Sequence, residues 1–416
     1  MNLYPLYIDP GTGSMLFSIL IGVAATLYFV VRALIIKAKT ALWGGKNQGA
    51  KNRAFCNEVS RANYVIYAED KRYWNLFKPV LDEFERRELP LQYLTSSKDD
   101  PCFESSFKHI APEYVGEGNK AYARLNLLSA DFVLMTTPGI DVYQLKRSKV
   151  AKHYSHLLHA PGDATMYRLF GIDYFDSILL TGDYQAQDIR ALEKLRSLPE
   201  KQLVTVGCPY LDVAANNIQA SPALPHPFTV LVSPSWGPSA LLARYGEKLL
   251  DPLLDTGFHI IVRPHPQSKI SESAMLDRLT VRYQDRSNIE WDYEPSNTMS
   301  ISKADIMISD FSGIIFDYMF LFDKPVIYAK DKIDMRPYDA DDLDNEPWQF
   351  RILKETGIEL SESNFPSIGE VIKQASNSVA LTDARRKAKD TAWQRRGKAG
   401  ELIAGFMIET VAKLTA

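Results

Sequence analysis

Two short stretches of the sequence carry side chains that could hold an anionic ligand. In the first, "VRPHPQS" at residues 262–268, Arg263 and His265 follow a predicted buried strand and alternate with two prolines. Alternate residues of an extended segment point to the same side, so a guanidinium and an imidazole can face one anionic group. The prolines remove two backbone donors, which sheet continuation alone would not favour. This stretch predicts the basic half of a phosphate site.

The second stretch, "ISDFSGIIFDYMFLFDKPVIY" at residues 308–328, places a hydroxyl-rich turn between a strand and a helix. Ser309 and Asp310 end the strand, Ser312 is suited to cap the helix, and Gly313 would let a ligand approach the backbone closely. Helix N-termini carry partial positive charge and bind phosphates. A helix cap alone would explain Ser312. The basic and hydroxyl-rich stretches are predicted to follow neighbouring strands of the same half, which favours a diphosphate site that needs no metal.

A third loop, "SPSWGPS" at residues 233–239, is rich in Ser, Gly and Pro and contains Ser235, Trp236 and Gly237. Such a turn can direct backbone N–H groups at a phosphate, although many strand-to-helix loops share this composition. We include these three residues in the predicted substrate site.

A histidine in "LLHAPGD", residues 157–163, is a candidate general base. His159 ends an apolar segment, and an imidazole that titrates near neutrality can take a proton from a hydroxyl nucleophile. The alternative is a hydrogen-bonded core histidine, and we interpret the neighbouring His153 and His156 in that way.

The elements that must position these loops form two alternating series of strands and helices. In the first half, strands are predicted at "NYVIYA", "LPLQYL", "DFVLMTT", His153–Leu158 and Ser177–Leu180. In the second half they are predicted at "FTVLVSP", "FHIIVRP", "LTVRYQ", "ADIMISD" and "KPVIYA". Strands that alternate with helices indicate parallel sheets of the doubly wound type, with ligands at the carboxyl ends of the strands.

The Pro- and Ala-rich stretch "QASPALPHP" separates the two series. We therefore predict an α/β protein with two Rossmann-like domains that face a cleft, an N-terminal one over 61–220 and a C-terminal, donor-binding one over 228–416. The second includes the helical tail of the chain.

The N-terminus predicts a membrane anchor over residues 1–40, followed by a linker over 41–60. Met15–Val31 contains no charge, and the apolar run extends to Ile36. About 20 apolar residues cross a bilayer as a helix. Basic residues follow the run and only Asp9 precedes it, which is the reverse of a signal peptide. The positive-inside tendency places the N-terminus outside and the remaining chain in the cytoplasm, at the cytoplasmic membrane. A buried core helix is the alternative.

Composition and missing motifs narrow the function. The net charge of −3 gives no reason to expect nucleic-acid binding. The three cysteines lie far apart, and motifs for P-loop, zinc-protease and α/β-hydrolase chemistry are absent. The acidic run "DADDLDNE", residues 339–346, contains Asp-x-Asp, which could hold a hard divalent cation, but we interpret it as a solvated loop.

In combination, these motifs resemble the CDP-glycerol glycerophosphotransferase family, which includes teichoic acid polymerases. The resemblance rests on "RPHP", "SDFSGIIFDYMFLFDKPVIY", "GCPYLD" at 207–212, "VSPSWGPSALL" and the placement of His159, and it covers roughly Tyr154–Tyr328. Where the family has a second serine, this chain has Gly313. The resemblance implies a GT-B fold and a transfer step without a metal or other cofactor.

Carried over to this chain, the resemblance implies that His159 acts on the acceptor hydroxyl and that His265, with Arg263, stabilises the diphosphate and the departing CMP. The full expected substrate-binding set is Arg263, Ser309, Asp310, Ser312, Gly313, Asp317, Ser235, Trp236 and Gly237. The expected partners are CDP-glycerol or a similar CDP-polyol, a lipid-linked glycan acceptor of the cell envelope, and the membrane. The alternatives are a GT-B glycosyltransferase that uses a nucleotide sugar and a non-catalytic, anchored binding module.

Overall fold

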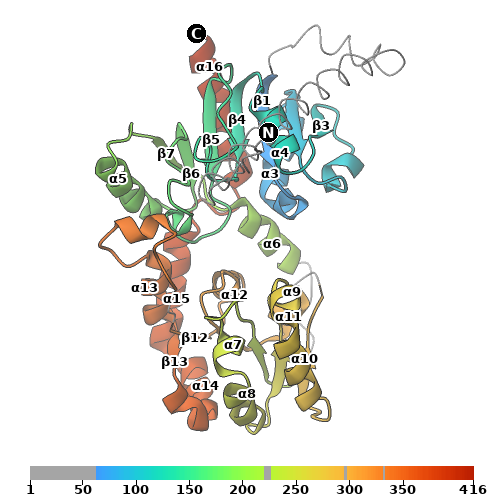
Figure 1. The fold of residues 1–416 in the computed structure, drawn as a ribbon, viewed down its shortest axis with the longest axis vertical. Helices are drawn as coiled ribbons and strands as arrows, with labels where there is room; N and C mark the ends of the chain where they lie inside the picture. The colour runs from blue at the N-terminus through green and yellow to red at the C-terminus, as the bar shows by residue number, and fades with distance from the viewer. Residues whose placement is uncertain (1–61, 220–225, 295–297, 331–332) are drawn as a thin grey trace, which may run out of the picture. The chain divides into compact units, whose positions relative to one another are not determined.

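The structure is a computed structural model that describes residues 62–219, 226–294, 298–330 and 333–416 (Figure 1). The predicted membrane span at 15–36 and the linker at 41–60 lie outside the described residues. Within the described ranges, no helix is both long enough and apolar enough to cross a bilayer.

The first half of the chain forms a seven-stranded parallel sheet in the order β3-β2-β1-β4-β5-β6-β7. Parallel strands need crossover connections, and a sheet covered on both faces favours continuous apolar strands. The wholly buried β4 "ADFVLM" fits this pattern apart from Asp131. The strands are β1 Ala62–Ala68, β2 Leu91–Thr95, β3 Ile110–Tyr114, β4 Ala130–Met135, β5 His153–Leu157, β6 Ser177–Leu180 and β7 Gln202–Thr205. The α-helices are α3 Trp74–Arg86, α4 Asn119–Leu125, α5 Ala186–Leu195 and α6 Pro209–Gln219.

The second half forms a six-stranded parallel sheet in the order β10-β9-β8-β11-β12-β13. Its strands are β8 Thr229–Val232, β9 His259–Val262, β10 Ile289–Trp291, β11 Ile306–Ser309, β12 Val326–Ala329 and β13 Ile358–Leu360. The helices that follow in the chain are α7 Leu241–Tyr245, α8 Glu247–Leu254, α9 Ser268–Ser271, α10 Ser273–Arg282, α11 Thr298–Lys303, α12 Ile314–Phe322, α13 Trp348–Thr356, α14 Ile368–Asn377, α15 Val379–Ala392 and α16 Ala399–Thr415.

The strand order reverses direction at the same point in each sheet. The chain winds outward from β1 to β3 and resumes at β4, and it winds outward from β8 to β10 and resumes at β11. Ligands of open parallel sheets bind at such a switch point, beyond the carboxyl ends of the two strands that flank it. In the second sheet those strands are β8 and β11, which carry the two hydroxyl-rich loops.

The sequence prediction is wrong for one strand and incomplete for four. "LTVRYQ" lies mostly in α10, where Leu276, Leu279 and Tyr283 are buried at helical spacing while Val281 is exposed. The strands β3, β7, β10 and β13 are additional; β10 and β13 each have only three residues, too short for a clear pattern.

The last helix, α16, lies against the first sheet rather than the second (Figure 1). It packs on α3 and β4, and its apolar face joins the core that contains Phe77, Phe84 and Phe132. The tail that we assigned to the second domain is therefore divided: α15 contacts α12 and α13, and α16 returns to the first sheet.

Met407 tests the part that α16 plays in the first core. Its side chain is fully buried in that core. We expect Met407→Ala to lower the free energy of unfolding by about 2–5 kcal/mol, since truncation leaves a cavity. Leu414→Ala, on the same helix but 38% exposed, should cost no more than about 0.5 kcal/mol. Equal costs for the two variants in urea unfolding would contradict this packing.

Candidate functional site

The three loops predicted to bind an anion lie side by side at the carboxyl edge of the second sheet. Strands β9, β8 and β11 are consecutive in the sheet order. The loops that follow them contain Arg263 to Pro266, Ser233 to Ser239, and Asp310 to Gly313, respectively. Our prediction that the basic and hydroxyl-rich stretches follow neighbouring strands is wrong, because β8 lies between β9 and β11. The "SPSWGPS" loop after β8 therefore comes between them at the same edge of the sheet.

A cavity of about 420 Å³ opens between these loops. It brings together five of the predicted residues, while Ser309, Asp310, Ser235, Trp236 and Gly237 are not part of its wall. The lining residues are Ser233, Pro234, Arg263, Pro264, His265, Pro266, Ser312, Gly313, Ile314 and Asp317. We call this cavity the anion cavity.

Asp310 is a structural centre of the site rather than part of the cavity wall. Its carboxylate accepts hydrogen bonds from the backbone N–H groups of Ser235 (2.8 Å), Leu241 (2.8 Å) and Ser312 (3.2 Å). The residue is 1% exposed. Burial raises its pKa, and the three N–H donors oppose that rise. Asp310 therefore fixes two loops against each other.

Ser309 also faces inward. Its hydroxyl is buried and donates to the carbonyl oxygen of Ser233 at 2.6 Å. The structure therefore assigns Ser309 and Asp310 to holding the site together, where the sequence predicts direct substrate contacts.

The residues at the N-terminus of α12, Ser312 to Ile314, line the anion cavity. The N-cap is Gly313, one residue after Ser312, which we expected to be the cap. The amides of Ser312, Ile315 and Phe316 donate within the chain, to Asp310 and to the carbonyl oxygens of Ser312 and Gly313. Gly313 has an ordinary helical φ of −59°, and a Cβ built there would meet nothing within 4 Å. Neither strain nor crowding requires glycine at this position. The open space lies where an anion would meet the helix dipole.

His265 lines the cavity, and one of its ring nitrogens is bonded within the chain. Its Nδ1 accepts the N–H of Gln267 at 3.1 Å, so the neutral ring carries its proton on Nε2. Burial lowers the pKa of His265, opposed by Glu272. Trp236 lies beside the ring, with centroids 6.3 Å apart. His265 is thus a neutral N–H donor near pH 7.

Arg263 is committed to a buried ion pair. Its guanidinium donates to the carboxylate of Asp292, and to the carbonyl oxygen of Glu294 at 2.7 Å. Burial alone would raise the pKa of Asp292, but donation from Ser300, the Glu294 N–H and Arg263 lowers it. Arg263 lines the cavity, and its guanidinium also joins the loop after β9 to Asp292 and Glu294, which follow β10.

Asp317 and Tyr210 form a contact that the sequence pattern does not predict. Asp317, one turn into α12, accepts a hydrogen bond from the Tyr210 hydroxyl at 3.2 Å. Burial raises the pKa of Asp317 to about 7. Tyr210 lies at the start of α6 in the "GCPYLD" stretch. That stretch is the sequence feature that could have pointed to this tyrosine.

His159 lies on the first sheet, outside the anion cavity, and has partners that we did not predict. Its Nδ1 is within hydrogen-bond distance of the Thr136 hydroxyl (3.3 Å) and the Tyr167 hydroxyl (3.2 Å). The ring of Tyr73 packs edge-on against it at 5.6 Å. If Nδ1–H donates to one of these oxygens, the Nε2 lone pair is left to accept a proton. Thr136 directly follows β4, the strand next to β5. The order of the strands is therefore what could have indicated that Thr136 lies near His159.

Burial, with a smaller contribution from Arg72, lowers the pKa of His159 to about 4. The ring is therefore neutral at pH 7, as a proton acceptor must be. The other histidines of β5 behave as core residues. His153 bonds to the Ser177 hydroxyl at 2.8 Å, and the buried ring of His156 packs against Tyr167 and Phe175.

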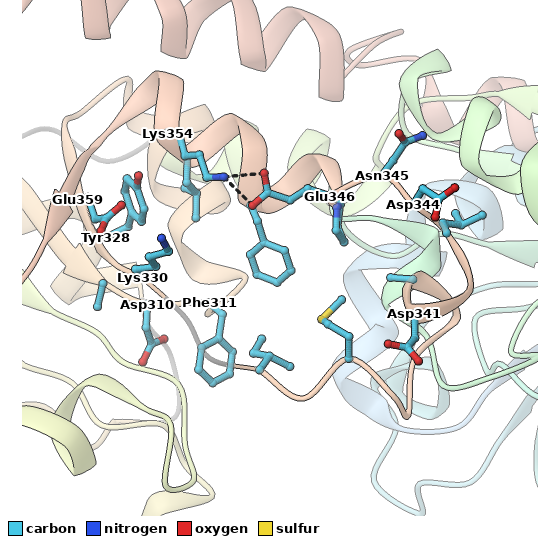
Figure 2. A pocket seen from close by; sticks show the side chains of 18 residues that line it. Asp310, Phe311, Tyr328, Lys330, Asp341, Asp344, Asn345, Glu346, Lys354 and Glu359 are labelled. Atoms are coloured by element: carbon cyan, nitrogen blue, oxygen red, sulfur yellow. Dashed lines mark hydrogen bonds and ion pairs between the residues drawn. The ribbon is translucent and has the colours of Figure 1, made fainter.

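A second cavity, of about 460 Å³, has Asp310 and Phe311 of the β11–α12 loop in its wall (Figure 2). The rest of the wall comes from β12, α13, the segment between them, and Glu359 of β13. Figure 2 shows Lys354 and Glu346 paired at its edge, with Asp341, Asp344 and Asn345 along one side. The acidic run at 339–346 is therefore only partly a solvated loop, because it walls a cavity and its first residue, Asp339, is fully buried.

No metal centre is evident in the parts of the chain that the structure describes. There, no three His, Cys, Asp or Glu side chains are grouped closely enough to hold an ion. The binding groups of the anion cavity are instead N–H and O–H donors.

Comparison with known proteins supports the resemblance. Residues 186–344 match the family model of CDP-Glycerol:Poly(glycerophosphate) glycerophosphotransferase. No curated protein matches the chain. The match spans α5 to the acidic run and contains the whole wall of the anion cavity.

Similar solved structures show the fold. The Wall Teichoic Acid Polymerase TagF is 15% identical, with 92% of this chain and 98% of that chain covered and a TM-score of 0.52. A UDP-GlcNAc 2-epimerase from Methanocaldococcus jannaschii is 14% identical, with coverages of 83% and 99% and a TM-score of 0.52. One from Rickettsia bellii is 14% identical, with 85% and 98% covered and a TM-score of 0.56. The predicted GT-B-like α/β fold with parallel sheets is confirmed.

The raised pKa of Asp317 predicts pH-dependent anion binding. Below pH 7 the carboxyl is neutral, and above pH 7 it adds a negative charge to the cavity wall. We expect the Kd for sulfate, which stays fully ionised, to rise about three- to tenfold from pH 6 to pH 8. Burial lowers the pKa of His265, which limits the contribution of this ring to the pH dependence. Calorimetry should show that Asp317→Asn removes the pH dependence; an unchanged slope would mean that Asp317 does not face the anion.

Proposed function

We propose that this chain, whose residues 186–344 belong to the CDP-glycerol:poly(glycerophosphate) glycerophosphotransferase family, transfers glycerol phosphate or a related polyol phosphate from a CDP-activated donor to a lipid-linked glycan. The chain is a glycerophosphotransferase-like enzyme. The donor, the acceptor and the release of CMP are our proposal. It rests chiefly on the anion cavity, whose wall brings together His265 from the loop after β9 and Ser312 and Gly313 from the start of α12.

The proposed reaction is an in-line phosphoryl transfer. The acceptor hydroxyl oxygen forms a bond to the phosphorus that carries the polyol. The bond from that phosphorus to the bridging oxygen breaks, and CMP leaves with the electron pair. The hydroxyl proton passes to Nε2 of His159. Such reactions depend mainly on positioning and on charge stabilisation, which the cavity offers through its N–H groups.

The low pKa of His159 is compatible with a role as general base once the donor is bound. Its pKa is held down by burial and by the cation of Arg72. A diphosphate bound nearby would offset that cation and raise the pKa toward neutrality. A loose transition state also needs the base only late, when the hydroxyl has become acidic.

A membrane anchor at residues 15–36 would serve the same reaction, because a lipid-linked acceptor is confined to the membrane surface. In this proposal the span is single, the N-terminus lies outside, and the catalytic part of the chain lies in the cytoplasm.

The decisive measurement is release of CMP from CDP-glycerol by the full-length protein in detergent, with membranes as the source of acceptor. We expect His159→Ala to slow release about 10²–10⁴-fold as loss of a general base. His265→Ala should slow it about 10²–10³-fold as loss of a charge-stabilising donor. The exposed His226 provides the matched control, and His226→Ala should behave as wild type.

Other outcomes would point elsewhere. No CMP from any CDP-polyol, together with UDP release from a UDP-sugar, would replace this proposal with a glycosyltransferase. Normal polymer formation in cells that carry both histidine variants would favour a non-catalytic module.

Gly313 permits a test of donor placement. Because a Cβ fits there, both Gly313→Ala and Gly313→Ser should leave the free energy of unfolding within about 0.5 kcal/mol of wild type. The serine restores the hydroxyl of the family pattern, so we expect it to lower the CDP-glycerol Kd about three- to tenfold relative to alanine, as one added hydrogen bond. Gly405→Ala, equally open and remote, is the control. Equal affinities for the Ala and Ser variants would place the phosphates elsewhere.

A further inference from the structure

The segment that opens the acidic run pairs with the chain just beyond His159. Arg168 and Tyr338 form an antiparallel bridge, and the Leu169 N–H donates to the Pro337 carbonyl oxygen at 3.1 Å. The Asp339 N–H donates to the carbonyl oxygen of Tyr167 at 3.0 Å. A segment between β12 and α13 is thus joined by an isolated β-bridge to a loop that follows β5.

The Asp339 side chain strengthens this pairing. Its Oδ1 accepts the Phe170 N–H at 2.7 Å and the guanidinium of Arg196 at 2.7 Å. Asp339 is fully buried, and the side chain of Arg196 is 9% exposed. Arg196 also donates to Asp173 at 2.8 Å and lies over the Phe170 ring. The pairing is therefore a buried, charge-assisted clamp, a kind of contact that is costly to break on one side.

The clamp ends at the candidate base. Tyr167, whose carbonyl it holds, carries the hydroxyl that lies 3.2 Å from Nδ1 of His159. The Tyr167 ring also packs edge-on against the buried ring of His156, with centroids 5.1 Å apart. With its main chain and its ring both held, Tyr167 has little freedom to move its hydroxyl away from the imidazole.

We propose that Asp339 is a positioning residue for the transfer reaction: it holds Tyr167 so that the tyrosine hydroxyl accepts Nδ1–H of His159 and leaves the Nε2 lone pair for the acceptor. The inference rests on the proposed function in that it takes His159 as the base. It also gives the acidic run a purpose, because Ala340 and Asp341, the next residues, line the cavity beside the β11–α12 loop. The segment that walls the second cavity thereby also holds the loop that carries Tyr167.

Kinetics of CMP release test the proposal in full-length protein. We expect Tyr167→Phe and Asp339→Ala each to lower kcat about tenfold with the KM for CDP-glycerol unchanged. Because both act through one contact, the double variant should lose no more than the stronger single variant. Asp339→Asn keeps an acceptor for the Phe170 N–H and should recover part of the loss.

The matched control is Asp334→Asn, in the same segment but in an exposed pair with Arg336. It should behave as wild type. Multiplicative losses in the double variant, or normal kcat in Asp339→Ala with a wild-type melting curve, would overturn the proposal.

A spectroscopic measurement separates this inference from the proposed function. In ¹⁵N-labelled protein, the His159 ring should show a protonated Nδ1 and an unprotonated Nε2 in the wild type, with the other tautomer populated in Asp339→Ala and Tyr167→Phe. This result would stand even if no CDP-polyol were a substrate. An identical tautomer ratio in all three proteins would overturn the positioning role whatever the reaction.

Discussion

The carboxylate of Asp310 is the contact on which the anion cavity depends. A buried carboxylate is costly unless its oxygens are satisfied, and here three backbone N–H groups from two loops satisfy them. The loop after β8 cannot move away from the start of α12 without leaving that charge unpaired. The inward hydroxyl of Ser309 adds a bond between the same two strand ends. The space in front of the α12 N-terminus is therefore preorganised, so little ordering is left to occur when an anion binds.

With these groups turned inward, the proposed anion site would act mainly through N–H and O–H dipoles. Arg263 is paired with Asp292, and His265 is a neutral donor. The remaining groups are the Ser312 hydroxyl and the amides at the start of α12. N–H donors in a partly dry site stabilise developing charge without holding a product dianion as firmly as free cations would. An enzyme that must release a charged nucleotide benefits from that difference.

The sequence predicts the framework better than the direction in which each side chain points. Alternating apolar runs identify both sheets, and the basic and hydroxyl-rich stretches do meet. Ser309 and Asp310 could not be distinguished from ligand contacts, because their partners, Ser233 and Leu241, lie some 70 residues away in sequence. Asp339 looked solvated because its neighbours are acidic, and only the tertiary structure supplies Arg196. Thr136 and Tyr167 could not be identified from the sequence for the same reason, because only the fold brings their hydroxyl groups next to His159.

Asp212 joins both segments that connect the two sheets, namely α6 and the return from α15 to α16. These contacts link the anion cavity to the first sheet and its helices. Asp212 of α6 accepts the indole N–H of Trp393 (2.9 Å) and the N–H of Ala399 (3.3 Å), which lie at either end of the return from α15 to α16. Two residues earlier, Tyr210 bonds to Asp317 in the cavity wall. Tyr210 and Asp212 lie on the same turn of α6. A shift of this helix would therefore change the bonds of Asp212 to Trp393 and Ala399 as well as the bond of Tyr210 to Asp317. Ionisation of Asp317 changes the strength of the Tyr210 bond, so the charge state of the cavity wall and the hold on α6 are physically coupled.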